Sequence, residues 1–263
     1  MIILYQNISA TVSSATIRFY EELNDFLPSQ KRKHDISLTF KQRNSIKDMI
    51  ESMGVPHTEI DLILVNQTPV DFSYLVQDRD RISVYPVFES FDISSLNRLR
   101  PQPLRKLRFV LDTHLGKLTK YLRMLGFDTL YDNCCSDTEL ANLASDGEKR
   151  ILLTRDVGLL KHKMVSHGYF IRATQPRQQL VEIMDRFDLK KLITPFRRCV
   201  NCNGLLTPLE KTAALGRVPA QIYEDMNKFV ICDTCQQIYW QGSHYDRMMK
   251  LISHLLNTKG PPE

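Results

Sequence analysis

The sequence lacks any run of about 20 consecutive apolar residues, the length that a transmembrane helix needs. Its start, MIILYQNISATVSSA, also lacks the basic beginning and long apolar stretch of a secretory signal. Glycine and proline are scarce, with 10 and 12 among 263 residues, which excludes fibrous and low-complexity chains. A hydrophobic content of 43% supplies enough material for two cores. We therefore expect a globular protein of the cytoplasm that does not contact membranes.

Charge is distributed unevenly along the chain. Residues 1–95 carry 9 Lys and Arg against 13 Asp and Glu, a net charge of −4, whereas residues 96–263 carry 26 against 17, a net charge of +9. An acidic first third before a basic remainder predicts two modules with different partners. The basic module is the candidate for binding a polyanion.

The first module, residues 1–95, has the pattern of an α+β roll. Strands are predicted at residues 15–19, 36–40, 61–65 and 82–88. Between the second and third strands, Ser45 and Asp48 resemble a capping box that opens a short helix, which Gly54 ends. This order resembles the β-grasp, ubiquitin-like fold of small sulfur carriers. The free Gly-Gly tail of those carriers is absent, so the resemblance implies a fold and a docking surface for a protein partner, without sulfur transfer.

Residues 96–107 have the composition of a linker. Pro101 and Pro103 would interrupt a helix or a central strand. The basic residues around them fit either a solvated tether or a direct contact with a polyanion. We place the domain boundary in this segment.

The second module, residues 108–195, alternates between strand and helix patterns. Strands are predicted at residues 108–111, 129–131 and 150–154. After the first strand, leucines recur at helical spacing up to Gly126, at positions Leu115, Leu118, Leu122 and Leu125. A second helix is predicted from Ser136 through residue 144. This alternation favours a mostly parallel sheet covered by helices.

Three acidic residues are expected at one edge of this sheet. Asp112 directly follows one strand, Asp156 comes two residues after the end of another, and Asp137 lies in the first turn of a helix that begins on the same edge. Clustered carboxylates repel one another unless a divalent cation compensates them, and Mg²⁺ or Mn²⁺ prefers such oxygen ligands. The pattern predicts metal-dependent hydrolysis of a phosphodiester. Asp137 equally fits a helix-stabilising role, because Ser136 and Glu139 form a good capping box around it.

Basic residues lie beside these carboxylates. Lys117, Lys120 and Arg123 follow one another at three-residue spacing, on the side of the helix away from the leucines. They are candidates for holding the substrate backbone, although a solvated helix face has the same pattern. Thr154 and Arg155 adjoin Asp156 and are candidates for phosphate contacts or for supporting the carboxylate.

The last segment, residues 196–263, contains two CxxC pairs, Cys199 with Cys202 and Cys232 with Cys235. Two such pairs complete a tetrahedral site of four cysteines, so we predict a structural zinc ribbon followed by a helix. The 29 intervening residues indicate an insertion around residues 219–226. Basic and aromatic residues near the cysteines can grip unpaired bases, although Trp240 fits a ribbon core at least as well; these residues are Arg197, Arg198, Lys228, Tyr239 and Trp240.

Three separated motifs carry a resemblance to a known family. The stretches FVLDTHLGKLTKYLRMLGFDT, SDTELANLA and KRILLTRDVGLL, followed by the paired CxxC motifs, resemble the Mut7-C RNase family, a branch of the PIN-like nucleases. The resemblance implies a PIN-like sheet, Mg²⁺ or Mn²⁺ ligands at Asp112, Asp137 and Asp156, and cleavage of RNA. A fourth acidic ligand of many PIN domains has only loose candidates in Asp185 and Asp188.

Two functions from different classes follow. The first is a metal-dependent endoribonuclease whose zinc ribbon assists RNA binding. The second is a non-catalytic RNA-binding or adaptor protein that uses the ribbon for RNA and the β-grasp domain for a protein partner. A toxin of a toxin and antitoxin pair follows only from the wider PIN resemblance.

Overall fold

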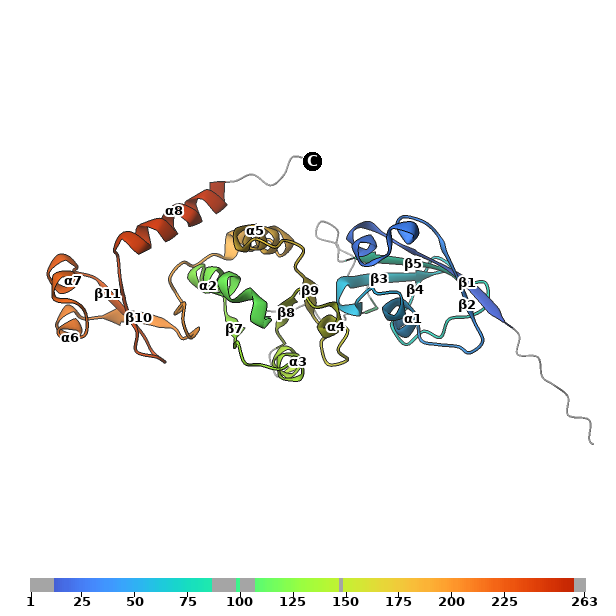
Figure 1. Cartoon of the computed structure of the whole chain (residues 1–263), viewed down its shortest axis with the longest axis horizontal. Coiled ribbons are helices and arrows are strands. Elements are labelled where there is room, and N and C mark those ends of the chain that lie inside the picture. The colour runs from blue at the N-terminus through green and yellow to red at the C-terminus, as the bar shows by residue number, and fades with distance from the viewer. Residues whose placement is uncertain (1–11, 87–97, 100–106, 147–148, 258–263) are drawn as a thin grey trace, which may run out of the picture. The chain divides into compact units, whose positions relative to one another are not determined.

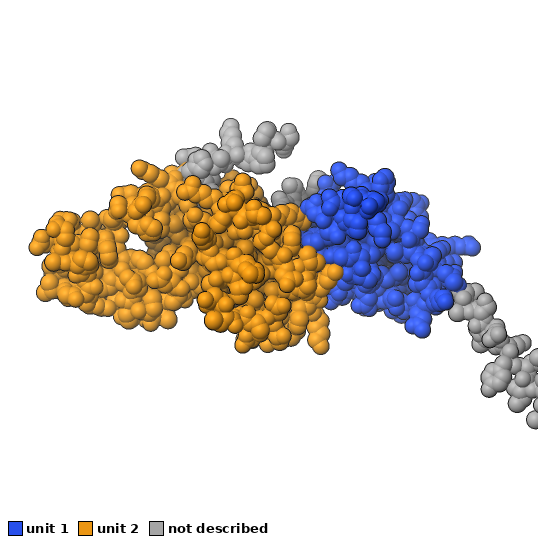
Figure 2. Space-filling view, in the orientation of Figure 1, with its two compact units in different colours: residues 1–103 blue, residues 104–263 orange. Residues whose placement is uncertain are grey.

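The computed structural model describes residues 12–86, 98–99, 107–146 and 149–257, the last four of these by their backbone alone. The chain divides into two compact units, residues 1–103 and 104–263 (Figure 2). Most of the predicted linker, residues 96–107, lies outside the described residues, as does the end of the strand predicted at residues 82–88. In the described ranges, no helix is long and apolar enough to cross a membrane.

The first unit contains a mixed sheet and helix α1 (Ile46–Ser52) (Figure 1). The strands are β1 (Ser13–Phe19), β2 (Ile36–Phe40), β3 (Ile60–Val65), β4 (Thr68–Pro69) and β5 (Arg81–Pro86), in the order β2-β1-β5-β3-β4. The central strands β1 and β5 are parallel, and the other pairs are antiparallel. This arrangement confirms the ubiquitin-like fold predicted from the sequence.

Local signals of the first unit explain its elements. The Ser45 side chain accepts the N–H of Asp48 at the start of α1. Gly54, just after the helix, has a φ of +106°, which an L side chain rarely adopts. Alternate residues of β1 are buried, including Ile17 and Phe19, because one face of the sheet packs on the core with α1.

The second unit is built on a parallel sheet in the order β7-β6-β8-β9. Its strands are β6 (Phe109–Leu111), β7 (Thr129–Tyr131), β8 (Ile151–Thr154) and β9 (Gly168–Phe170). Its helices are α2 (Gly116–Met124), α3 (Asp137–Ser145), α4 (Val157–Leu160) and α5 (Pro176–Arg186). The parallel sheet predicted for this module is therefore confirmed.

Helices cover both faces of this sheet because its central strands β6 and β8 are apolar except for Thr154 at the end of β8. Phe109 and Leu111 point to one face and pack with leucines of α2 and α5, whereas Val110 points to the other and packs with α3 and α4. Neighbouring β8 divides in the same way, with Leu153 on the first face and Leu152 on the second. Both faces of the sheet are thus covered by helices, and the carboxyl ends of its strands remain available for a functional site.

A three-stranded antiparallel ribbon follows, in the order β10-β11-β12. Its strands are β10 (Leu206–Leu209), β11 (Phe229–Cys232) and β12 (Ile238–Trp240). Between β10 and β11 the chain forms α6 (Lys211–Ala214) and α7 (Ala220–Asp225), where the sequence indicates an insertion. Helix α8 (Ser243–Asn257) then returns to the core of the parallel sheet, where Ile252 is buried.

Candidate functional site

Asp112 and Asp156 lie at the carboxyl ends of the neighbouring strands β6 and β8, and Thr154 connects them. The buried Thr154 hydroxyl donates to Asp112 Oδ2 at 2.7 Å and accepts the N–H of Asp156 at 2.9 Å. Asp112 is 8% exposed, and its Oδ1 accepts the Thr113 hydroxyl at 3.0 Å. Thr154 therefore supports the carboxylate of Asp112 and the backbone of Asp156, one of the two roles expected for it.

Asp156 is exposed and caps the short helix α4. Its Oδ1 accepts the N–H groups of Gly158 at 2.6 Å and Leu159 at 3.3 Å. The close approach depends on Gly158, where a Cβ would lie 3.0 Å from that oxygen. One carboxylate oxygen of Asp156 is thus held by capping α4, and this fixes the orientation of the Asp156 side chain beyond the end of β8.

Asp137 is the exposed first residue of α3, the helix that follows β7. Ser136 and Glu139 form the predicted capping box: the Ser136 side chain accepts the Glu139 N–H, and Glu139 Oε2 accepts the Ser136 N–H at 2.8 Å. The pKa of Glu139 is lowered by the hydrogen bonds from the backbone and side chain of Ser136. Because β7, β6 and β8 are adjacent and parallel, all three aspartates belong to one edge of the sheet.

The three aspartates nevertheless do not share one compact ligand sphere. Among the described residues, one group of at least three possible metal ligands has all its ligand atoms within 4.8 Å of one another, and it consists of the four ribbon cysteines. Asp112, Asp137 and Asp156 occupy the same edge without meeting that distance. The other acidic candidates are engaged elsewhere: Asp185 contacts Lys190 at 3.4 Å, and Asp188 contacts Lys191 at 3.5 Å.

A polar cleft of about 690 Å³ opens at this edge of the sheet. Lys117 and Lys120 line it together with His114, and both lysines are exposed, as the sequence predicted. Asp132 also lines the cleft, and sequence reasoning missed it. The signal was present, because Asp132 directly follows β7 in the way that Asp112 directly follows β6.

Arg123 does not join these lysines, because the ribbon covers this position of α2; both roles considered for it, a substrate contact and a solvated helix face, are therefore wrong. It is only 4% exposed. Its Nε donates to the carbonyl of Thr129 at 2.9 Å, and its Nη1 donates to the carbonyls of Val200 at 3.2 Å and Asn201 at 2.6 Å. Burial lowers the pKa of the guanidinium, against the opposing effect of nearby Cys199. Arg123 thus holds the first CxxC turn against α2.

Arg155 is likewise used within the protein. Its Nη1 donates to the carbonyls of Ile171, Arg172 and Ala173 at 3.0, 2.8 and 2.6 Å. These carbonyls follow β9, so Arg155 secures the segment that leads toward α5. The Nη1 that satisfies three carbonyls is not available to a phosphate, although the residue is exposed.

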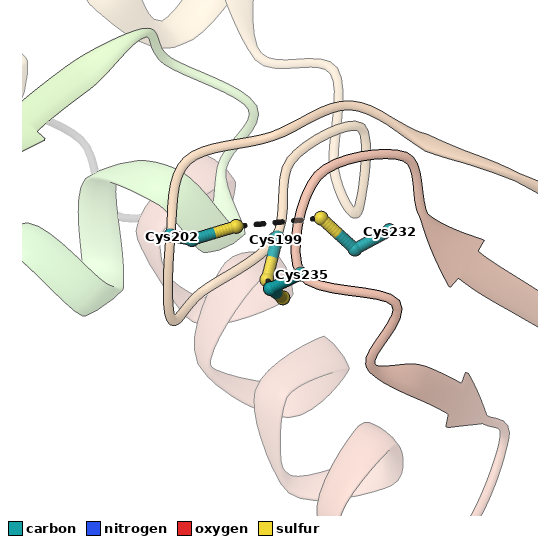
Figure 3. Close-up of side chains that lie close together, drawn as sticks. All are labelled: Cys199, Cys202, Cys232 and Cys235. Atoms are coloured by element: carbon teal, nitrogen blue, oxygen red, sulfur yellow. Dashed lines mark hydrogen bonds between the residues drawn. The ribbon is translucent and has the colours of Figure 1, made fainter.

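The four cysteines of the two CxxC pairs point toward one another (Figure 3). Cys199 Sγ lies 3.6 Å from Cys235 Sγ, and Cys202 Sγ lies 3.4 Å from Cys232 Sγ. A tetrahedron of Zn–S bonds of about 2.3 Å separates its sulfurs by about 3.8 Å, so this donor set fits one zinc ion. The cysteines can therefore bind zinc, and four protein ligands leave no position for substrate.

Tyr239 on β12 supports this cluster. Its hydroxyl lies 3.1 Å from Cys199 Sγ, and burial together with the neighbouring thiolate raises the pKa of the phenol. Burial opposes ionisation of Cys199, but hydrogen bonds from Tyr239 and from the backbone of Asn201 and Cys202 lower the pKa of the thiol to about 7. Cys199 thus favours the thiolate, which is the form that binds a metal, whereas burial raises the pKa of Cys202 in the same turn.

The same turn is joined to the parallel sheet by a half-buried ionic cluster around Asp128. Arg150 Nη1, Asn203 Nδ2 and Arg198 Nη2 donate to the Asp128 carboxylate at 2.9, 2.8 and 3.3 Å. Burial raises the pKa of Asp128, but the hydrogen bonds from Arg150 and Asn203 outweigh it and lower the pKa. Asn203 Oδ1 also accepts the N–H of Thr129 at 3.0 Å, at the start of β7. The ribbon and the parallel sheet therefore belong to one compact unit and are joined by polar contacts.

The remaining predicted ribbon residues take different positions. Trp240 is half-buried and packs against the ribbon core, and it also lines a second cavity. Lys228 and Arg198 line that cavity too, but Arg198 is paired with Asp128. Arg197 is exposed. Trp240 thus packs in part against the ribbon core, one of the two roles considered from the sequence, and contact with unpaired bases stays a prediction.

Comparison with protein families identifies both units. Residues 107–252 match the family model of the Mut7-C RNAse domain, and residues 12–92 match that of the Mut7-C ubiquitin domain. No curated protein and no solved structure matches the chain. The first match covers more than half of the 263 residues and contains the aspartates, the lysines and all four zinc-type cysteines. The chain therefore belongs to the Mut7-C RNAse domain family, with a Mut7-C ubiquitin domain in front.

Proposed function

We propose that the second unit is a metal-dependent endoribonuclease of PIN-like fold. The observation that carries the proposal is the chain of contacts from Asp112 through the Thr154 hydroxyl to Asp156, at the ends of two adjacent parallel strands. The buried Thr154 hydroxyl bonds the Asp112 carboxylate and the backbone N–H of Asp156. It therefore positions both acidic residues at one edge of the sheet. The family match supports RNA as the class of substrate.

The proposal assigns Mg²⁺ or Mn²⁺ to the carboxylates of Asp112, Asp137 and Asp156. When bound, such an ion activates water and stabilises the charge that develops on the phosphate. Thr154 holds the Asp112 carboxylate in one orientation, and the N–H groups of α4 hold that of Asp156. The exposed lysines Lys117 and Lys120 line the polar cleft, whose lining residues do not include the three aspartates, and would bind the RNA backbone there.

The proposal also covers the other parts of the chain. Zinc at the four cysteines would have a structural role and would keep the ribbon in place to assist RNA binding. The ubiquitin-like unit would dock a protein partner, and the protein would act in the cytoplasm. These roles extend beyond the family matches, which support a nuclease-related role and a ubiquitin-like domain.

Asp156→Asn tests the proposal with little risk to folding. Asparagine caps helices as well as aspartate, so the amide oxygen can still accept the N–H groups of Gly158 and Leu159 while the charge is lost. We expect cleavage of single-stranded RNA in Mn²⁺ to fall by at least about a hundredfold, with zinc content and unfolding temperature unchanged. Asp225→Asn, on exposed α7, is the matched control and should cleave normally. Equal rates for Asp156→Asn and the unmodified protein would refute the assignment.

A second candidate function is supported by the separation of the three carboxylates. Since they do not form a group within 4.8 Å, a non-catalytic RNA-binding or adaptor protein is consistent with the same fold. That candidate predicts salt-sensitive RNA binding in which the strand stays intact in Mg²⁺ and in Mn²⁺. The same cleavage assay therefore decides between the two functions.

A further inference from the structure

The second unit contains an aromatic cavity of about 480 Å³ that the proposed catalytic roles leave unused. Helix α2, the ribbon and helix α8 all contribute to its walls. The volume lies within the range of about 300–1,000 Å³ that is usual for pockets that bind small groups. Five aromatic side chains line it: Tyr121, Phe196, Tyr239, Trp240 and Tyr245.

Three of these aromatic side chains are held in place by their neighbours. Phe196 and Tyr245 pack with ring centroids 4.6 Å apart and an angle of 31° between their planes. Trp240 rests on the ribbon core, and the backbone of Gly242 lies so close to the indole edge that a Cβ added there would be 3.2 Å from Nε1. Fixed aromatic faces are suited to stacking on a flat ring because little side-chain freedom remains to be lost.

Exposed lysines line this cavity, and two of them also line the polar cleft at the carboxyl ends of the parallel strands (the catalytic edge). Lys117 and Lys120 line both the aromatic cavity and the polar cleft at the carboxyl ends of the strands. They lie one helical turn apart on α2, and Lys228 adds a third exposed ammonium group from the ribbon. Within the described ranges none of the three has an ion-pair partner. Positive charge at the opening and aromatic rings inside match a nucleotide, with its phosphate outside and its base within.

We infer that this cavity binds an unpaired base of the RNA substrate by stacking, while Lys117 and Lys120 hold the adjoining phosphates between the cavity and the catalytic edge. The inference rests on the proposal that RNA is the substrate. It assigns single-stranded RNA as the substrate class, because the bases of a duplex are paired and stacked on one another and cannot enter. The ribbon is thereby a part of the substrate site, with Trp240 and Tyr239 as its stacking residues.

The single tryptophan of the chain makes the test direct, since Trp240 is the only indole that can report. The zinc-loaded full-length protein is titrated with a short, end-labelled single-stranded RNA in the absence of Mg²⁺ and Mn²⁺. Anisotropy of the label measures binding, and tryptophan fluorescence measures stacking. We expect the two signals to saturate together for the single strand, and the same strand annealed to its complement to leave the tryptophan signal unchanged.

Two variants test the cavity separately. Trp240→Ala should weaken binding of the single strand about tenfold, which corresponds to about 1.4 kcal/mol. Lys228→Glu changes an exposed residue and should weaken binding while lowering the salt slope by about one. Lys163→Glu makes the same charge change at an exposed lysine outside both cavities, and it should bind more tightly than Lys228→Glu. Zinc content and unfolding temperature show whether each variant is folded.

The outcomes separate this inference from the proposed function. RNA binding without a tryptophan response, equal responses to strand and duplex, or equal binding by Lys228→Glu and Lys163→Glu would each overturn the inference. A tryptophan response in a protein that never cleaves RNA would support the cavity and refute the nuclease. Cleavage that depends on Asp156 with a silent Trp240 would support the nuclease and refute the cavity.

Discussion

Arg123→Met separates the structural role of this arginine from the substrate role that the helix pattern predicted. Methionine keeps an apolar stem of similar length and removes the guanidinium that serves three carbonyls. A hydrogen bond to a charged group contributes about 1.5–3 kcal/mol, but water can partly replace the donor at the exposed Asn201. We therefore expect the free energy of unfolding of the second unit to fall by about 3–4 kcal/mol, and its unfolding temperature to fall by roughly 10 °C.

The fluorescence of Trp240 follows this change, because the only tryptophan of the chain lies in the second unit. Lys120→Met is the matched control, since it removes an exposed cation from the same helix. It should unfold like the unmodified protein and bind RNA less tightly. Arg123→Lys keeps the charge without the planar fork and should be intermediate in stability. If Arg123→Met unfolds at the temperature of the unmodified protein and only raises KM for RNA, the structural interpretation of Arg123 is refuted.

Two further predictions concern the sheet and its contact with the ribbon. Asp128→Asn should cost about 3 kcal/mol at neutral pH. Because the pKa of Asp128 is lowered from 3.8, its contribution is present above that value and is lost as the pH falls through the lowered pKa, so denaturation curves of the variant and the unmodified protein should converge in acid. Thr154→Val should lower kcat about tenfold and stability by about 1–2 kcal/mol, with Thr154→Ser restoring both; a Thr154→Val protein with normal kcat would show that the hydroxyl does not orient Asp112.

Elements fixed by neighbouring residues were predictable from the sequence. The capping box of Ser136 and Glu139 forms as expected, and Ser45 begins α1. The parallel pairing of β6 and β8 follows from the alternation of strand and helix patterns along the chain, so the common edge of Asp112 and Asp156, which both come after these strands, was predictable as well. The CxxC spacing predicted the cysteine cluster because two thiols of one turn are brought together by the local chain.

The position of Arg123 could not be predicted in this way, because its partners lie 77 and 78 residues further along the chain. Helical periodicity places Arg123 on the polar side of α2, and only the folded ribbon covers that position. Arg155 shows the same limit over 16 to 18 residues, since its carbonyl partners follow the next strand. In both cases an arginine that reads as a substrate contact satisfies backbone carbonyls that the sequence does not reveal.

The turn that holds Cys199 and Cys202 contacts the parallel sheet. Zinc bound by the four cysteines would therefore affect the site at the carboxyl ends of the strands. Arg123 and the Asp128 cluster bind the turn to α2 and to the start of β7, and Asn201 of the same turn lines the polar cleft. On its other side, Tyr239 joins Cys199 to the aromatic cavity. Zinc bound by these cysteines would therefore order one wall of each cavity, although it has no open position for substrate. With RNA as the proposed substrate, the ribbon would therefore belong to the substrate site as much as the sheet does.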